Sequence, residues 1–209
     1  MNILDFLFPR CCLGCGKKGR YFCDDCLQRV EPASPQIYPV RYPLDGLISL
    51  FAYQGLIRQA IIKLKYHFVA DLADEIVNLA FRLNEKSFSD FNLDDYLLVS
   101  VPLHWRRRNW RGFNQSEVLG RKLAQKLKIK FAPDLLIRKR LTQPQVKLKQ
   151  KERRQNVRAA FDINYKIYKN YKHYIVFDDV WTTGATMKEC ARVLKKAGAK
   201  KVLGLTLAR

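Results

Sequence analysis

The fold class is decided by one stretch of the chain, Ile175-Val176-Phe177-Asp178-Asp179-Val180-Trp181-Thr182-Thr183-Gly184-Ala185-Thr186. The apolar residues at its start are typical of a buried strand, and the polar residues that follow predict a loop over 178–184. Apolar residues then recur at helical spacing as far as Lys196, and Gly198 can end that helix. The stretch therefore predicts a strand, a loop and a helix in succession.

The same succession occurs earlier in the chain. An apolar run over 96–101 predicts a strand that a proline ends, and residues 115–127 have helical periodicity. Two further amphipathic helices are predicted over 56–68 and 70–83, and a last strand over 201–207. Alternation of this kind predicts an α/β fold with a five-stranded, mostly parallel sheet flanked by helices.

The polar part of the first stretch has a composition suited to a sugar phosphate. Threonine hydroxyls, the backbone N–H groups beside Gly184 and the positive end of the following helix can form a cradle for a phosphate monoester. The adjacent acids Asp178 and Asp179 would repel a phosphate unless sugar hydroxyls or a magnesium ion lie between them. The alternative is a capped turn without a ligand, because Asp, Thr and Gly are all favoured there.

The first 34 residues differ in composition from the rest of the chain. Five of the six cysteines lie there, and a linker-like run with two prolines predicts a boundary near residue 35. Four thiolates in two Cys-x2-Cys pairs suit a structural zinc ion, with two disulfides or a redox-active pair as alternatives. Cys11 is interpreted as a bystander, and so short a segment is expected to depend on metal for its folding. The predicted zinc ligands are Cys12, Cys15, Cys23 and Cys26.

The chain is strongly basic, with 39 Lys and Arg against 19 Asp and Glu and a formal net charge of +20 over 209 residues. Such a charge attracts nucleic acid, anionic lipid or phosphorylated metabolites, or it reflects a basic surface without a ligand. Arginines in the basic run 104–111 can pair with pyrophosphate and its two tryptophans can stack on bases. The second run, 138–158, is interpreted as a mobile flap, a track for single-stranded DNA or a solvated charged face. The candidate nucleic-acid contacts are Trp105, Arg111, Lys147, Lys149, Arg153, Arg154 and Arg158.

A family resemblance enters with these motifs. The stretch around Asp178 resembles the phosphoribosyl-pyrophosphate signature of type I phosphoribosyltransferases, in which four apolar residues precede two acids and a Thr/Gly loop. Together with the cysteine pairs, the remaining motifs are similar to those of the ComF family, competence-associated phosphoribosyltransferase-like proteins linked to natural transformation. These motifs are Lys63-Leu64-Lys65-Tyr66, Val101-Pro102-Leu103, Arg111-Gly112-Phe113-Asn114-Gln115, Thr142-Gln143-x-Gln145, Arg154-x-Asn156 and Ala160-Phe161.

The resemblance implies a type I phosphoribosyltransferase fold over 35–209 and a zinc knuckle over 1–34 in front of it. The core of the fold would be the parallel sheet predicted from the strand and helix pattern. A hood is implied near 36–55 and 131–165.

The resemblance also implies a site. The two acids would face the ribose hydroxyls with magnesium, the threonine loop would hold the 5′-phosphate, and residues 101–108 would form the pyrophosphate loop. In many purine-salvage members an acid stands where this chain has Thr182. The implied contacts are Asp178, Asp179, Thr182, Thr183, Gly184, Ala185, Thr186, Pro102, Leu103 and His104.

Two classes of function are open at this point. An enzyme would displace magnesium-bound pyrophosphate, with Arg106, Arg107 or Arg108 stabilising charge, and would pass a phosphoribosyl group to an acceptor that the sequence does not identify. A binding protein would handle single-stranded DNA with the phosphoribosyl site as a sensor, or would use the knuckle to dock a competence helicase or translocation motor. No apolar run reaches the roughly 18 residues that span a bilayer, so a cytoplasmic protein is expected, with peripheral membrane association at most.

Overall fold

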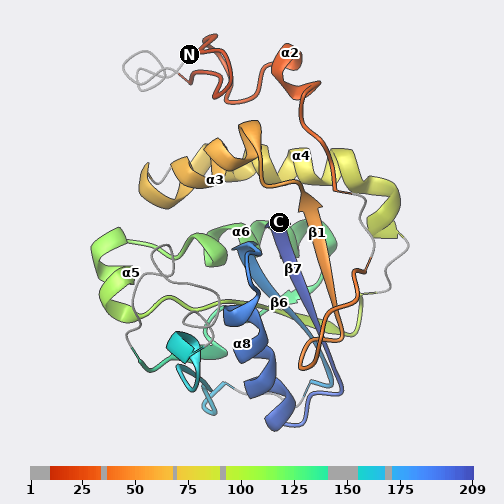
Figure 1. Cartoon of the computed structure of the whole chain (residues 1–209), viewed down its shortest axis with the longest axis vertical. Helices are drawn as coiled ribbons and strands as arrows, with labels where there is room; N and C mark the ends of the chain where they lie inside the picture. Colours follow the sequence, from red (N-terminus) through yellow and green to blue (C-terminus); the bar gives the residue numbers. More distant parts are fainter. Residues whose placement is uncertain (1–9, 34–36, 68–69, 90–92, 141–154, 168–170) are drawn as a thin grey trace.

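The structure, a computed structural model, describes residues 10–33, 37–67, 70–89, 93–140, 155–167 and 171–209. Figure 1 shows strands side by side with helices around them and the cysteine-rich segment at one end. The elements follow in the order α2 (Asp24–Leu27), β1 (Gly46–Phe51), α3 (Gly55–His67), α4 (Ala70–Ser89), β2 (Tyr96–Ser100), α5 (Trp105–Arg111), α6 (Gln115–Leu127), β3 (Lys130–Phe131), β4 (Leu136–Arg138), β5 (Phe161–Ile163), β6 (His173–Val180), α8 (Ala185–Lys196) and β7 (Lys201–Ala208).

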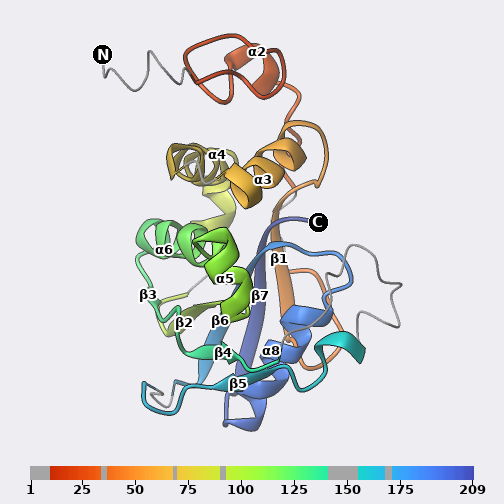
Figure 2. The same ribbon diagram turned by 90° about the vertical axis from the view of Figure 1, so that its left-hand side faces the viewer.

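Five strands form one sheet in the order β1-β7-β6-β2-β3, and every neighbouring pair is parallel. Strands β1, β2, β6 and β7 are buried over most of their length, as expected where helices cover both faces of a sheet. In Figure 2, α6 lies on one side of the sheet and α8 on the other. The predicted α/β fold with a five-stranded sheet is confirmed.

Side chains along β6 are divided between two cores. Phe177 belongs to the core under α3, α4 and α6, whereas Val176 belongs to the core under α8 and the two short strands β4 and β5. Successive side chains of a strand point to opposite faces. The alternation therefore directs Asp179 toward the α3 and α6 face, and Asp178, on the α8 side at the edge of the sheet, still accepts from Ser116 of α6.

Strand β6 is longer than predicted, because it continues through both acids to Val180. Its neighbour β7 runs on to Ala208, so Asp178 pairs with Thr206 and the ladder reaches the last residue of each strand. The acids therefore lie on the strand itself. The predicted loop begins only at Trp181, where the backbone N–H still donates to the carbonyl of Ala208 (2.8 Å).

Parts of both segments that were predicted to form a hood belong to the main sheet. Residues 46–51, inside the predicted segment 36–55, form the edge strand β1, which pairs along β7 because its side chains are buried throughout. Phe131 belongs to β3 of the same sheet. Within 131–165, β4 and β5 form a separate antiparallel pair, and residues 141–154 between them lie outside the described residues.

The cysteine-rich segment packs against α3 and α4. Tyr21 and Phe22 belong to the same buried cluster as both helices. The backbone N–H of Tyr21 donates to Glu75 Oε2 (3.2 Å), and the Lys63 ammonium lies 5.3 Å from the centre of the Tyr21 ring. The segment was expected to lack a core of its own, and the helices supply part of the core that it lacks.

Replacing Ile76 with Ala tests which face of α4 is buried. Its side chain is fully buried on α4, so its loss should lower the free energy of unfolding by about 2–5 kcal/mol. Asn78→Ala, on the exposed side of the same helix, should change it by less than about 0.5 kcal/mol. Urea denaturation followed by circular dichroism measures both, and equal small effects would contradict the assigned face of α4.

Candidate functional site

Two carboxylates stand at the carboxyl edge of the parallel sheet, where α/β proteins bind ligands. The Ser116 hydroxyl donates to Asp178 Oδ1 (2.9 Å), and Gln115 Nε2 donates to Asp179 Oδ2 (3.3 Å). Both donors belong to the first turn of α6, which Asn114 caps by accepting the N–H of Ser116 (3.2 Å). Among the described residues, no hydrogen bond reaches Asp178 Oδ2 or Asp179 Oδ1. Each acid thus keeps one oxygen that can accept from a ligand.

The charge of this acid pair is partly balanced from α3. Lys65 Nζ lies 2.9 Å from Asp179 Oδ2. Burial, together with the neighbouring charge of Asp179, raises the pKa of Asp178 to about 7, although Lys65 and the Ser116 hydroxyl act in the opposite direction. Near neutral pH, Asp178 therefore exchanges its proton readily, and a cation or a hydroxyl donor would favour its ionised form.

The turn predicted to hold a phosphate follows directly after the acids. Gly184 caps α8 with φ 68°, a left-handed conformation that glycine adopts without strain, and a Cβ there would lie 2.1 Å from the Trp181 ring. The backbone N–H of Ala185 donates to Thr183 Oγ1 (3.4 Å). The first turn of α8 contains no acidic residue, so its N–H groups and positive end favour an anion. The loop Thr182–Thr186 thus lies beside the acid pair.

The predicted pyrophosphate loop, residues 101–108, is a loop only in its first half. Helix α5 begins at Trp105, because the His104 side chain accepts a backbone N–H of its first turn (3.3 Å). Burial, followed by the charges of nearby arginines, lowers the pKa of this histidine. The residues that connect β2 to α5 are Val101, Pro102, Leu103 and His104.

The three candidate catalytic arginines lie on α5 and differ in their surroundings. The guanidinium of Arg106 lies over the Trp105 ring (5.3 Å to the centroid), and Arg108 Nη2 lies 3.2 Å from Glu117 Oε2. Burial, with a neighbouring arginine, lowers the pKa of Arg107. Arg107 is the half-buried one of the three, and its charge acts on His104 and on Arg138 of β4.

The sequence analysis did not place four residues next to the acids that the structure brings near them. Arg138 of β4 packs over the Phe161 ring, and burial followed by the charge of Arg107 lowers its pKa to about 10 against the opposing charge of Asp178. Lys65 and Gln115 fall within sequence motifs on which the family resemblance rests, and this was the only sign in the sequence that they belong to the site. The four residues are Lys65, Gln115, Ser116 and Arg138.

Two of the predicted nucleic-acid contacts, Trp105 and Arg111, lie on helix α5. Trp105 and Trp110 are 59% and 77% exposed. Arg111 lies over the exposed ring of Tyr66 (5.8 Å), and its Nη1 donates to Gln115 Oε1 (2.5 Å). Among the other predicted contacts, the structure describes one, the exposed Arg158, whereas four lie outside the described residues: Lys147, Lys149, Arg153 and Arg154.

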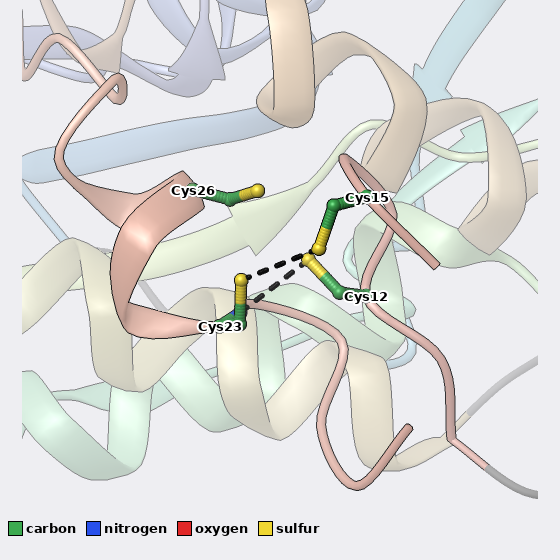
Figure 3. Close-up of side chains that lie close together, drawn as sticks. All are labelled: Cys12, Cys15, Cys23 and Cys26. Carbon is green, nitrogen blue, oxygen red and sulfur yellow. Dashed lines mark hydrogen bonds between the residues drawn. The ribbon is translucent and has the colours of Figure 1, made fainter. Parts of the chain in front are cut away.

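Four thiols meet in the cysteine-rich segment, and Figure 3 shows them directed toward one another. Their Sγ atoms all lie within 4.8 Å of one another. Cys11 is outside this group, and its backbone forms a bridge with Lys18. The four cysteines are the ones predicted from the spacing: Cys12, Cys15, Cys23 and Cys26.

The thiols influence one another's ionisation. Burial disfavours the Cys12 thiolate, but backbone N–H groups of Cys23, Gly14 and Cys15 outweigh it and lower the pKa of Cys12 to about 6. The neighbouring Cys23 thiol, followed by burial, raises the pKa of Cys26 to about 12. Four thiolates so close together need a cation, and sulfur ligands suit a soft tetrahedral ion such as zinc.

None of the helices in the described ranges combines the length and the apolar composition that crossing a bilayer requires.

Comparison with known proteins places the chain in a family. A model of the phosphoribosyl transferase domain matches residues 114–209, which include α6, β6, the acid pair and α8. The chain is 31% identical to DNA utilization protein YhgH of Escherichia coli (strain K12) over 183 residues. This match covers 86% of this chain and 74% of that protein. It is 30% identical over 213 residues to Competence protein F of Haemophilus influenzae (97% and 85% of the two chains), and 30% identical over 164 residues to Competence protein ComFC of Bacillus subtilis (77% and 63%). These relatives are at least 30% identical to the chain over most of its length, and the chain has the parallel sheet and a phosphoribosyl transferase domain. The chain therefore belongs to the ComF family of phosphoribosyltransferase-like competence proteins.

Proposed function

We propose that this protein binds phosphoribosyl pyrophosphate with magnesium at the carboxyl end of β6 and acts in the uptake and handling of single-stranded DNA during natural transformation. The observation that carries the first half is the acid pair. Asp178 and Asp179 each keep a carboxylate oxygen that accepts no hydrogen bond within the described residues. Two such oxygens on one strand end suit the two hydroxyls of a ribose.

The surroundings of the acids fit the rest of this ligand. A 5′-phosphate would lie at the Gly184 turn, where N–H groups and the positive end of α8 are directed. The pyrophosphate would lie toward the connection between β2 and α5, near the partly buried Arg107 and Arg138. Magnesium prefers carboxylate and phosphate oxygens, so Asp178 and Asp179 are the residues that would hold it, and it would neutralise the charge of the pyrophosphate.

The reaction class that this arrangement supports is phosphoribosyl transfer, in which pyrophosphate leaves as an acceptor attacks the ribose. The described side chains would contribute positioning of the ribose and stabilisation of charge by Arg107. A protein that binds the same ligand as a sensor is the alternative, and pyrophosphate release in the presence of single-stranded DNA separates the two.

Changing both acids tests the ligand. Asp178→Asn with Asp179→Asn should weaken phosphoribosyl pyrophosphate binding by about a hundredfold or more, because hydrogen bonds to charged groups contribute about 1.5–3 kcal/mol each. The matched control is Asp94→Asn with Asp95→Asn, an exposed acid pair just before β2 at the opposite edge of the sheet. Isothermal titration calorimetry in the presence of magnesium measures the affinity of both variants for phosphoribosyl pyrophosphate. Equal weakening in the two variants would mean that the acids of β6 do not bind this ligand.

We propose zinc as the ion of the cysteine cluster, with a structural role. Three of the four cysteines are buried and their Sγ atoms already converge within 4.8 Å. Tetrahedral zinc with Zn–S distances of about 2.3 Å requires little further approach of the sulfurs. Because Tyr21 and Phe22 share a buried cluster with α3 and α4, loss of the ion should also weaken the contact with those helices.

The purified protein should therefore contain about one zinc per chain. Cys23→Ser should lower the zinc content and the thermal unfolding temperature, whereas Cys11→Ser should change neither. Elemental analysis and calorimetry measure the two effects. A protein without zinc whose Cys12, Cys15, Cys23 and Cys26 form disulfides would overturn the assignment.

A second binding function, for single-stranded DNA, is favoured by α5. The helix exposes Trp105 and Trp110 among four arginines, and base stacking on aromatic side chains needs no particular sequence. Two of the relatives are competence proteins by name and one is a DNA utilization protein. The charge of +20 would strengthen the attraction to a phosphate backbone.

Trp105→Ala with Trp110→Ala should reduce the affinity for a twelve-residue oligothymidine at least about tenfold, since stacking contributes about 1–3 kcal/mol per base. Tyr42→Ala with Tyr165→Ala, which removes two aromatic side chains of similar exposure elsewhere, should leave it unchanged. Fluorescence anisotropy at two salt concentrations measures both. If the two double variants bind alike, α5 is not the stacking surface.

A further inference from the structure

Lys65 is a charged side chain that reaches the acid pair from outside the sheet. It lies near the end of α3, and its ammonium is 2.9 Å from Asp179 Oδ2, where the two side chains are only 25% and 5% exposed. Because both partners are largely shielded from water, the attraction between this ammonium and the carboxylate is stronger than that of an exposed ion pair.

The direction of Lys65 is specific to this position. Lys63, two residues earlier on the same helix, extends the other way and lies over the Tyr21 ring of the cysteine-rich segment. Lys65 instead shares Asp179 Oδ2 with Gln115 Nε2. A fixed positive charge thus occupies the side of the acid pair that faces α3 and α6.

We propose that Lys65 is a resident counter-cation of Asp179, which prevents the acid pair from binding free divalent metal. The inference rests on the proposed function, and it assigns Lys65 a positioning role through its contact with Asp179.

The charges around Asp178 and Asp179 support this role of Lys65. Besides Lys65 on α3, the charge of Arg138 on β4 acts on Asp178, and Arg107 on α5 lies close enough to act on Arg138. A bare divalent cation would be repelled by these three positive charges, and Lys65 already balances part of the negative charge of the acid pair that would attract it. Magnesium already bound by pyrophosphate carries its own negative charge, and the same cations then attract the complex.

The test is a calorimetric titration with Mn²⁺ alone, which reports metal binding without any turnover. Wild-type protein loaded with zinc should bind Mn²⁺ weakly. Lys65→Met should bind it at least about tenfold more tightly, because an uncompensated carboxylate pair attracts a divalent ion. Lys63→Met removes the same charge from the same helix and should behave as wild type. Adding Asp178→Asn and Asp179→Asn to Lys65→Met should abolish the gain.

Other variants keep the inference falsifiable. Lys65→Arg retains the charge and should exclude Mn²⁺ as wild type does, and Lys65→Gln replaces Lys65→Met if the latter loses its cooperative thermal transition. Equal Mn²⁺ affinity in wild type and in a folded neutral variant would overturn the role of Lys65. Failure of wild type to bind phosphoribosyl pyrophosphate with magnesium would instead overturn the proposed function, so the two failures are distinguishable.

Discussion

The parallel pairing of β6 with β2 and β7 is the constraint on which the candidate site depends. It holds Asp178 and Asp179 on the last residues of a central strand, where alternation sends one side chain to each face. Lys65 of α3 and Gln115 of α6 contact Asp179, whereas Asp178 accepts from Ser116 of α6 and lies within the electrostatic reach of Arg138 of β4. The site is thus made where two separate cores meet the carboxyl edge of one sheet.

Local patterns in the sequence predicted the elements well, because buried strands and amphipathic helices have distinct periodicities. They could not predict that β6 continues through the acids, since its end is set by the length of its neighbour β7. Residues 46–51 were predicted to belong to a hood, because their own sequence does not reveal a partner strand. Their pairing with β7 identifies them as an edge strand of the sheet. The partners Lys65 and Arg138 are remote from Asp178 in sequence, and no local pattern connects them.

The structure also brings the basic helix and the acid pair into one network. Arg111 at the end of α5 donates to Gln115, Gln115 donates to Asp179, and Asp179 pairs with Lys65. Tyr66, next to Lys65, lies against Arg111 and completes a ring of contacts among three helices and β6. The proposed nucleic-acid surface on α5 is therefore separated from the acid pair by the Gln115 side chain alone.

Recognition of the ribose by the acid pair is the central claim, and sugar analogues test it most directly. Ribose 5-phosphate and 2-deoxyribose 5-phosphate differ by one hydroxyl, and titration of each into the unmodified protein isolates that group. The deoxy sugar should bind at least about tenfold more weakly, because a partly buried carboxylate would lose its hydrogen-bond donor. Equal affinities would mean that Asp178 and Asp179 do not hold the ribose hydroxyls and would contradict the account.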